Sequence, residues 1–154
     1  MNTYKVGFFG HREMYDLFKK EKLLTRIVEE LVEANSVVEF FVGRSGDFDE
    51  IAASVVKSAK RRKGENGIFL TLVLPYTSAK IEYYEKYYDD IIIPEELAFV
   101  HPKQSYSRRN EWIVERVDAL IVNVEKSQGG AYRAMQYAER LGKKIINLSD
   151  FSEK

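Results

Sequence analysis

A pair of adjacent glycines offers the clearest chemistry in this sequence. Gly129 and Gly130 follow a predicted strand over Ala119–Val124, with Ser127 just before them, and they open a predicted helix over Gly130–Leu141. This order places unpaired N–H groups and the positive end of a helix dipole where an anion can bind. The turn lacks the full dinucleotide fingerprint and the Lys-Ser/Thr of a Walker loop. The spacing therefore predicts a phosphate site, without assigning it to either motif.

The loop after the first predicted strand carries a second candidate. Gly10, His11 and Arg12 follow a strand over Tyr4–Phe9. Glycine permits a sharp turn, and the next residues can direct N–H groups and a guanidinium at a phosphate. The alternative is an ordinary strand end with a surface histidine and arginine.

The loop after the next predicted strand, Val37–Val42, brackets a basic residue and a hydroxyl with glycines, and a carboxylate follows in a predicted helix. These residues are Gly43, Arg44, Ser45, Gly46 and Asp49. We expect the loop to add donors for a phosphate and Asp49 to accept bonds from ribose hydroxyls. Capping of the helix by Ser45 or Asp47 is the alternative.

Two tyrosines are candidates for stacking on a base. Tyr76 follows Pro75, which ends a strand over Ile68–Leu74 because proline cannot continue a central strand. Tyr106 lies at the start of a predicted helix over Ser105–Val117. Packing of either ring on its own protein is the alternative.

The same predicted helix carries Arg108, Arg109 and Asn110 close to its start. Cations near a helix N-terminus oppose the helix dipole, and a local rule that is broken often marks function. We therefore predict that Arg109 and Asn110 contact the ligand. Pairing of an arginine with Glu111 is the alternative.

Strands and helices alternate along the chain, and the strands are largely apolar on both faces. The remaining predicted elements are helices over Tyr15–Ala34, Asp47–Lys60 and Thr77–Tyr88, strands over Asp90–Ile93 and Lys144–Leu148, and an irregular stretch over Glu95–Gln104. This pattern predicts an α/β fold with a doubly wound, mostly parallel sheet and helices on both faces. Ligands bind such sheets at the carboxyl ends of the strands, where all these loops lie.

Composition limits the partners and the compartment. The 154 residues fit a single domain over 1–154, and 24 Lys and Arg balance 24 Asp and Glu. This balance argues against nucleic acid as a partner, and no apolar run is long enough to cross a membrane. Without cysteine, disulfides and thiolate metal sites are excluded, and we expect a cytoplasmic protein with no metal and no cofactor.

The order of these motifs resembles the SLOG superfamily, and most closely its small bacterial and phage branch related to YpsA. The resemblance rests on Gly10-His11-Arg12, Gly43, Gly46, Asp49, Pro75-Tyr76, Arg109-Asn110, Trp112, Val114 and Gly129-Gly130. It implies a Rossmann-like fold and binding of nucleotides or nucleotide-derived signals. Relatives include the Lonely-guy phosphoribohydrolases and the DNA-uptake protein DprA, and members often form homodimers or larger homo-oligomers.

One departure from this family favours binding over catalysis. Lonely-guy enzymes have a catalytic glutamate soon after the glycine turn, where this chain has Gln136. Cleavage of a glycosidic bond needs a placed carboxylate. We therefore expect a sensor, carrier or sequestering protein for an ADP-ribose-like molecule. The alternative is a nucleotide N-glycosidase or a deoxyribosyltransferase-like enzyme that uses Glu111 or Asp49, and a DNA-associated role like that of DprA ranks last.

Overall fold

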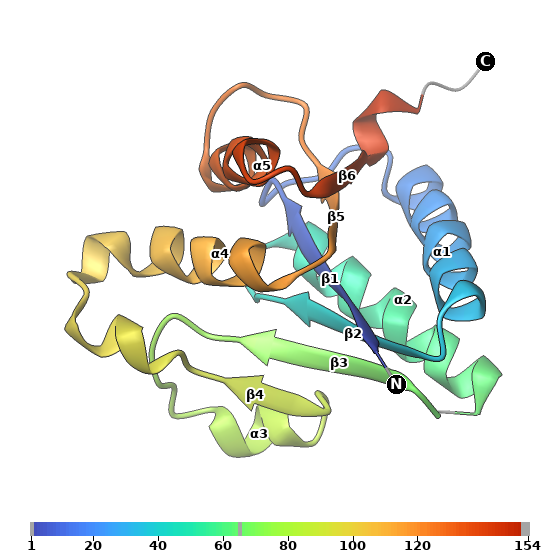
Figure 1. Cartoon of the computed structure of the whole chain (residues 1–154), viewed down its shortest axis with the longest axis horizontal. Coiled ribbons are helices and arrows are strands. Elements are labelled where there is room, and N and C mark those ends of the chain that lie inside the picture. Colours follow the sequence, from blue (N-terminus) through green and yellow to red (C-terminus); the bar gives the residue numbers. More distant parts are fainter. Residues whose placement is uncertain (1, 65, 152–154) are drawn as a thin grey trace.

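Six parallel strands form one sheet in the computed structural model, which describes residues 2–64 and 66–151 (Figure 1). The strands are β1 (Thr3–Gly10), β2 (Val37–Val42), β3 (Ile68–Val73), β4 (Asp90–Ile92), β5 (Ala119–Asn123) and β6 (Lys144–Asn147). Their order across the sheet is β4-β3-β2-β1-β5-β6, and every neighbouring pair is parallel. The predicted sheet is therefore confirmed.

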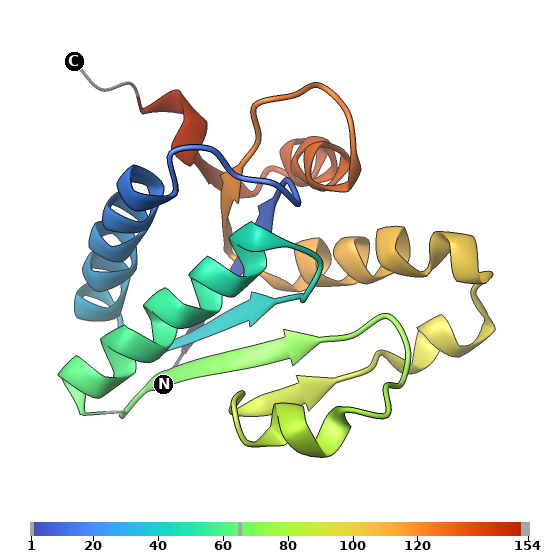
Figure 2. The ribbon, with the colours of Figure 1, turned by 180° about the vertical axis from the view of Figure 1, so that it is seen from behind.

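Helices cover both faces of this sheet because its central strands are apolar on both sides. In β1, for example, Phe8 packs into the core beneath α1 (Leu17–Ala34) and α2 (Asp47–Lys63), while Phe9 packs into the core beneath α4 (Ser105–Arg116) and α5 (Gly130–Arg140). Figure 2, seen from behind, shows α2 in front of the sheet and α4 beyond it. The fold is α/β and Rossmann-like, as predicted.

The strand order reverses at β1, which pairs with β2 on one side and β5 on the other. The chain turns to opposite faces after these two strands, so a crevice opens at their carboxyl ends. The register brings Gly10 beside Asn123 at this edge. Loops that are more than a hundred residues apart in the sequence therefore meet here.

The tyrosine-rich segment differs from the prediction. Of the helix expected over Thr77–Tyr88, only α3 (Ile81–Glu85) forms. Ser78 ends the preceding loop in a turn, with its carbonyl accepting from the Ile81 N–H, and the chain must soon reach the edge strand β4. Tyr84 and Tyr88 are buried in the core, so packing explains these two rings.

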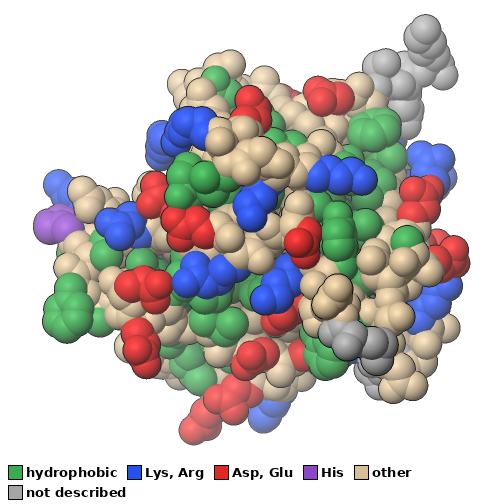
Figure 3. Space-filling model, viewed as in Figure 1, with side chains coloured by type: hydrophobic (Ala, Val, Ile, Leu, Met, Phe, Trp, Pro, Cys, Tyr) green, Lys and Arg blue, Asp and Glu red, His purple; other side chains and the backbone are tan. Residues whose placement is uncertain are grey.

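Three short 3-10 turns complete the described secondary structure: Glu95–Phe99, Pro102–Gln104 and Leu148–Asp150. No helix within residues 2–64 and 66–151 is long and apolar enough to cross a membrane. Acidic and basic side chains are interspersed over the face shown in Figure 3, as the balanced composition leads one to expect.

Candidate functional site

A pocket of about 360 Å³ lies at the carboxyl edge of the sheet, where the strand order reverses. Its walls come from the loops after β1, β2 and β5 and from one side of α4. The predicted residues that line it are Gly10, His11, Arg12, Gly43, Ser45, Asp49, Tyr106, Arg109, Asn110, Gly129 and Gly130. The structure thus brings four of the proposed sequence segments into one site.

The Gly129-Gly130 turn is the open part of this wall. Gly129 has a φ of 94°, a backbone conformation that favours glycine. No side chain caps the N-terminus of α5, so its first N–H groups lack a side-chain partner. A Cβ on Gly130 would have only the Asn110 side-chain nitrogen near it, at 3.6 Å. The turn therefore has both the donors and the space that an anion needs.

Two exposed arginines line the pocket, and their guanidinium groups are available to a ligand. Arg12 and Arg133 both line it, and within the described part of the chain neither guanidinium has a hydrogen-bond or ion-pair partner. Arg133 was missed by the sequence reasoning, although it follows Gly130 by three residues in α5. That spacing places it on the same side of the helix, which was the available signal.

Arg109 is the buried cation of the site, with 5% of its surface exposed. Its Nη1 donates to the Val73 carbonyl at 2.8 Å and its Nε to the Asn110 Oδ1 at 2.9 Å. Burial lowers the pKa of this guanidinium, while Asp49 opposes the shift. A Cβ on Gly43 would lie 2.6 Å from Nη1, so this glycine makes room for the arginine. Arg109 therefore joins the end of β3 to α4, and its Nη2 also donates to the Ser45 Oγ in the loop after β2, at 3.4 Å.

The carboxylate of Asp49 already accepts a hydrogen bond from the loop between β2 and α2. Its Oδ2 accepts a hydrogen bond from the Ser45 N–H at 2.7 Å, which satisfies a donor just before α2. Burial raises the pKa of this carboxyl, against the Ser45 bond and Arg109, which lower it. No side chain caps α2, whose N-cap is Gly46, so the capping alternative for Ser45 or Asp47 is not realised. Asp49 lines the pocket, and its contact with a ligand stays a prediction.

Gly10 and Gly46 serve close packing between loops. A Cβ on Gly10 would lie 2.5 Å from the Phe48 ring, and a Cβ on Gly46 would lie 2.5 Å from the Arg12 Cα. The Asp47 N–H donates to the Arg12 carbonyl at 2.8 Å, which joins the β1 and β2 loops. These contacts account for both glycines without a phosphate.

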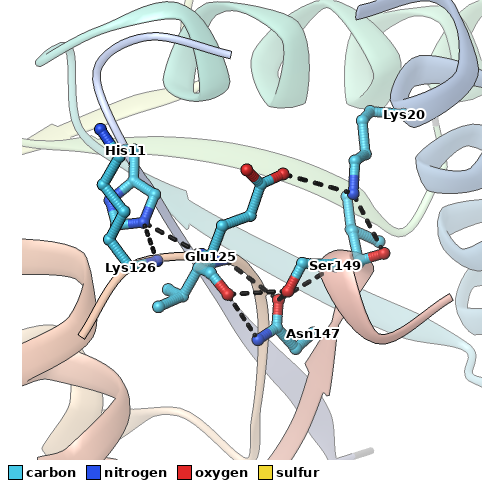
Figure 4. Close-up of polar contacts among 8 residues, drawn as sticks. His11, Lys20, Glu125, Lys126, Asn147 and Ser149 are labelled. Carbon is cyan, nitrogen blue, oxygen red and sulfur yellow. Dashed lines mark hydrogen bonds and ion pairs between the residues drawn. The ribbon is translucent and has the colours of Figure 1, made fainter. Parts of the chain in front are cut away.

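His11 fixes the start of the loop that carries the glycine turn. Its Nε2 accepts from the N–H groups of Glu125 at 3.0 Å and Lys126 at 3.1 Å (Figure 4). Burial lowers the pKa of the imidazole, and the Lys126 charge lowers it further. On the other side of the same loop, Asn147 accepts from the Val124 N–H and donates to the Val124 carbonyl. His11 is thus a positioning residue for the wall of the pocket.

Other predicted residues do not line the pocket; they are Arg44, Gly46, Pro75, Tyr76, Ser127 and Glu111. The Arg44 Nη1 donates to the Tyr88 hydroxyl at 3.0 Å, and its guanidinium lies 4.8 Å from the centre of the Tyr84 ring. Glu111 lies 3.4 Å from Arg108, as in the pairing alternative. Among the described residues no group of three or more His, Asp or Glu side chains is arranged to hold a metal ion.

The fold and the pocket define a Rossmann-like α/β protein with a cationic, glycine-lined crevice. Its fold matches that of DNA processing protein A (DprA) from Streptococcus pneumoniae, with a TM-score of 0.65 and 17% identity over 92% of this chain and 49% of that one. DprA from Helicobacter pylori, described for its single-stranded DNA binding mode, matches with a TM-score of 0.64 and 14% identity over 96% and 70%. This chain thus spans about half the length of the first of these proteins. No protein-family model and no curated protein matches the sequence.

The prediction that nucleic acid is not a partner is contradicted by the similarity to DprA from Helicobacter pylori. The Helicobacter pylori protein, whose fold this chain shares, is described for its single-stranded DNA binding mode, so a protein with this fold can have nucleic acid as a partner. The prediction was wrong because it relied on net charge, which sums the whole surface and does not reveal a local group of cations.

Proposed function

We propose that this chain binds a nucleotide unit by its phosphate, as a sensor, carrier or sequestering protein. The observation that carries the proposal is the N-terminus of α5 at Gly129-Gly130, which has no side-chain cap and shares a pocket with Arg12 and Arg133. Neither guanidinium has a hydrogen-bond or ion-pair partner among residues 2–64 and 66–151. Backbone donors and guanidinium groups together are the usual partners of a phosphate.

The size of the pocket favours one nucleotide unit. Its volume of about 360 Å³ lies near the lower end of the range of roughly 300–1,000 Å³ for small-molecule sites. An ADP-ribose-like ligand, with two phosphates and two sugars, would have to extend beyond these walls. A mononucleotide unit is therefore the better match.

The unit has two possible sources, a free nucleotide and a nucleotide within single-stranded DNA. The second source is supported by the shared fold with the Helicobacter pylori protein and its single-stranded DNA binding mode. Both sources present the same phosphate chemistry to the pocket, so the experiment must separate them.

Titration calorimetry of the ligand-stripped protein tests the proposal with thymidine monophosphate, ADP-ribose and a short oligothymidylate. We expect Arg12→Glu and Arg133→Glu each to lower the affinity by roughly tenfold or more, about 1.4 kcal/mol. Lys22→Glu is the matched control, because it makes the same charge change on α1 outside the pocket. Oligothymidylate binding without monophosphate binding identifies DNA as the source, and the reverse identifies a free nucleotide. Absence of binding by all three ligands would overturn the proposal.

An enzymatic role remains a second candidate because Asp49 lines the pocket and burial raises its pKa. A raised pKa is what a carboxylic acid needs to donate a proton near neutral pH. This role predicts that the chain releases a base from a nucleotide and that Asp49→Asn abolishes the release. Chromatography of the nucleotide after incubation tests it, and intact nucleotide would rule it out.

A further inference from the structure

Two tyrosines from distant segments meet beside the pocket. Tyr106, in the first turn of α4, lines it, and Tyr76 comes from the loop after β3. Their ring centres are 5.9 Å apart and the rings are nearly perpendicular, at 85°. The face of one ring thus meets the edge of the other, and we call these two residues the Tyr76–Tyr106 pair.

Two interactions hold the Tyr76–Tyr106 pair in place, a hydrogen bond and a cation–π contact. The two hydroxyls lie 3.2 Å apart and share a hydrogen bond. The Arg109 guanidinium lies 5.4 Å from the centre of the Tyr106 ring, and Arg109 is itself fixed by the Val73 carbonyl. Such a pair is ordered before any ligand arrives, which lowers the entropy lost on binding.

The rings nevertheless remain accessible, with Tyr76 51% and Tyr106 43% exposed. Every nucleobase has an aromatic face, and proteins that bind single strands stack bases on such side chains. We infer that the base of the bound nucleotide stacks on the Tyr76–Tyr106 pair while its phosphate binds at Gly129-Gly130. This inference rests on the proposed function and adds selectivity for units that carry an unpaired base, because a base cannot stack here while it remains in a duplex.

The test compares thymidine monophosphate with deoxyribose 5-phosphate, which has the same phosphate and sugar but no base. We expect Tyr106→Ala and Tyr76→Ala each to weaken thymidine monophosphate binding by roughly 5- to 150-fold. Binding of deoxyribose 5-phosphate should not change in either variant. Tyr76→Ala is the cleaner of the two, because Tyr106→Ala also removes the ring beside which the Arg109 guanidinium lies.

The matched control is Tyr83→Ala, which removes another exposed tyrosine, on α3, outside the pocket. It should leave both affinities unchanged, and melting curves confirm that all three variants fold. Oligothymidylate should bind more tightly than a duplex of the same length, and Tyr76→Ala should reduce this preference.

Three results overturn parts of the reasoning separately. Unchanged thymidine monophosphate binding in both tyrosine variants excludes stacking, and an equal loss for both ligands makes the rings structural only. In either case the phosphate site stands if Arg133→Glu still weakens deoxyribose 5-phosphate binding. If the wild-type protein binds no phosphate ligand at all, the proposed function and this inference fail together.

Discussion

Replacement of Gly10 by alanine tests the interpretation of this glycine as a packing position. The added Cβ would lie 2.5 Å from the Phe48 ring and 2.6 Å from the Phe48 Cβ, well inside van der Waals contact. Phe48 is 1% exposed and packs edge-to-face on Phe8, so a shift of this ring would disturb its packing in the core. The substitution therefore overpacks the core.

Overpacking of this kind costs about 1–3 kcal/mol. Since one kcal/mol shifts the melting temperature of a domain of this size by roughly 2–4 °C, Gly10→Ala should melt about 2–12 °C below the wild type. Differential scanning calorimetry measures the shift, and urea unfolding gives the free energy independently.

Gly130→Ala is the matched substitution in the open turn. Its Cβ has only the Asn110 side-chain nitrogen near it, at 3.6 Å, and alanine is the better helix former. The melting temperature should therefore stay the same or rise, while the methyl group obstructs the phosphate site and lowers affinity by roughly tenfold. An unchanged melting temperature for Gly10→Ala would refute the packing argument. Full phosphate affinity in Gly130→Ala would refute the assignment of the turn.

Further substitutions probe the frame of the pocket. Burial lowers the pKa of His11 below its ordinary value of about 6.5, so the unfolded chain binds its proton first as pH falls. The stability due to His11 is thus fully present above about pH 6.5 and is lost as pH falls through the lower pKa of the folded state. Urea midpoints measured at successive pH values should therefore decrease as pH falls below about 6.5, and His11→Gln should make this decrease smaller. Arg109→Lys keeps the charge but loses the planar guanidinium, which donates to the Val73 carbonyl and to Asn110 at the same time. The free energy of unfolding in urea should therefore fall by about 1.5–3 kcal/mol. An unaltered urea midpoint would contradict the role of Arg109 in joining these segments. Asn147→Ala leaves the Val124 N–H without its acceptor and should cost about 1–3 kcal/mol in the same assay, whereas Lys144→Ala, exposed on the same strand, should cost little.

Much of the fold was predictable because it depends on local pattern. The run from Val37 to Val42 is apolar except for Glu39 and is followed by a glycine, and the structure has a strand over the same residues. The segment Thr77–Tyr88 was less predictable because its tyrosines suit a helix and a packed turn equally well. The nearby edge strand decided between these two states, and local sequence holds no record of that contact.

The candidate site shows the same division. The sequence by itself placed Gly129-Gly130 between a strand and a helix, because the order of strand, glycine turn and helix is local information. Only the tertiary structure decided that Gly10 and Gly43 face Phe48 and Arg109, since those contacts depend on how distant segments pack. It also turned Arg44 toward Tyr88 and brought Arg133 to the pocket, because the partner of a long side chain is set by its surroundings in space.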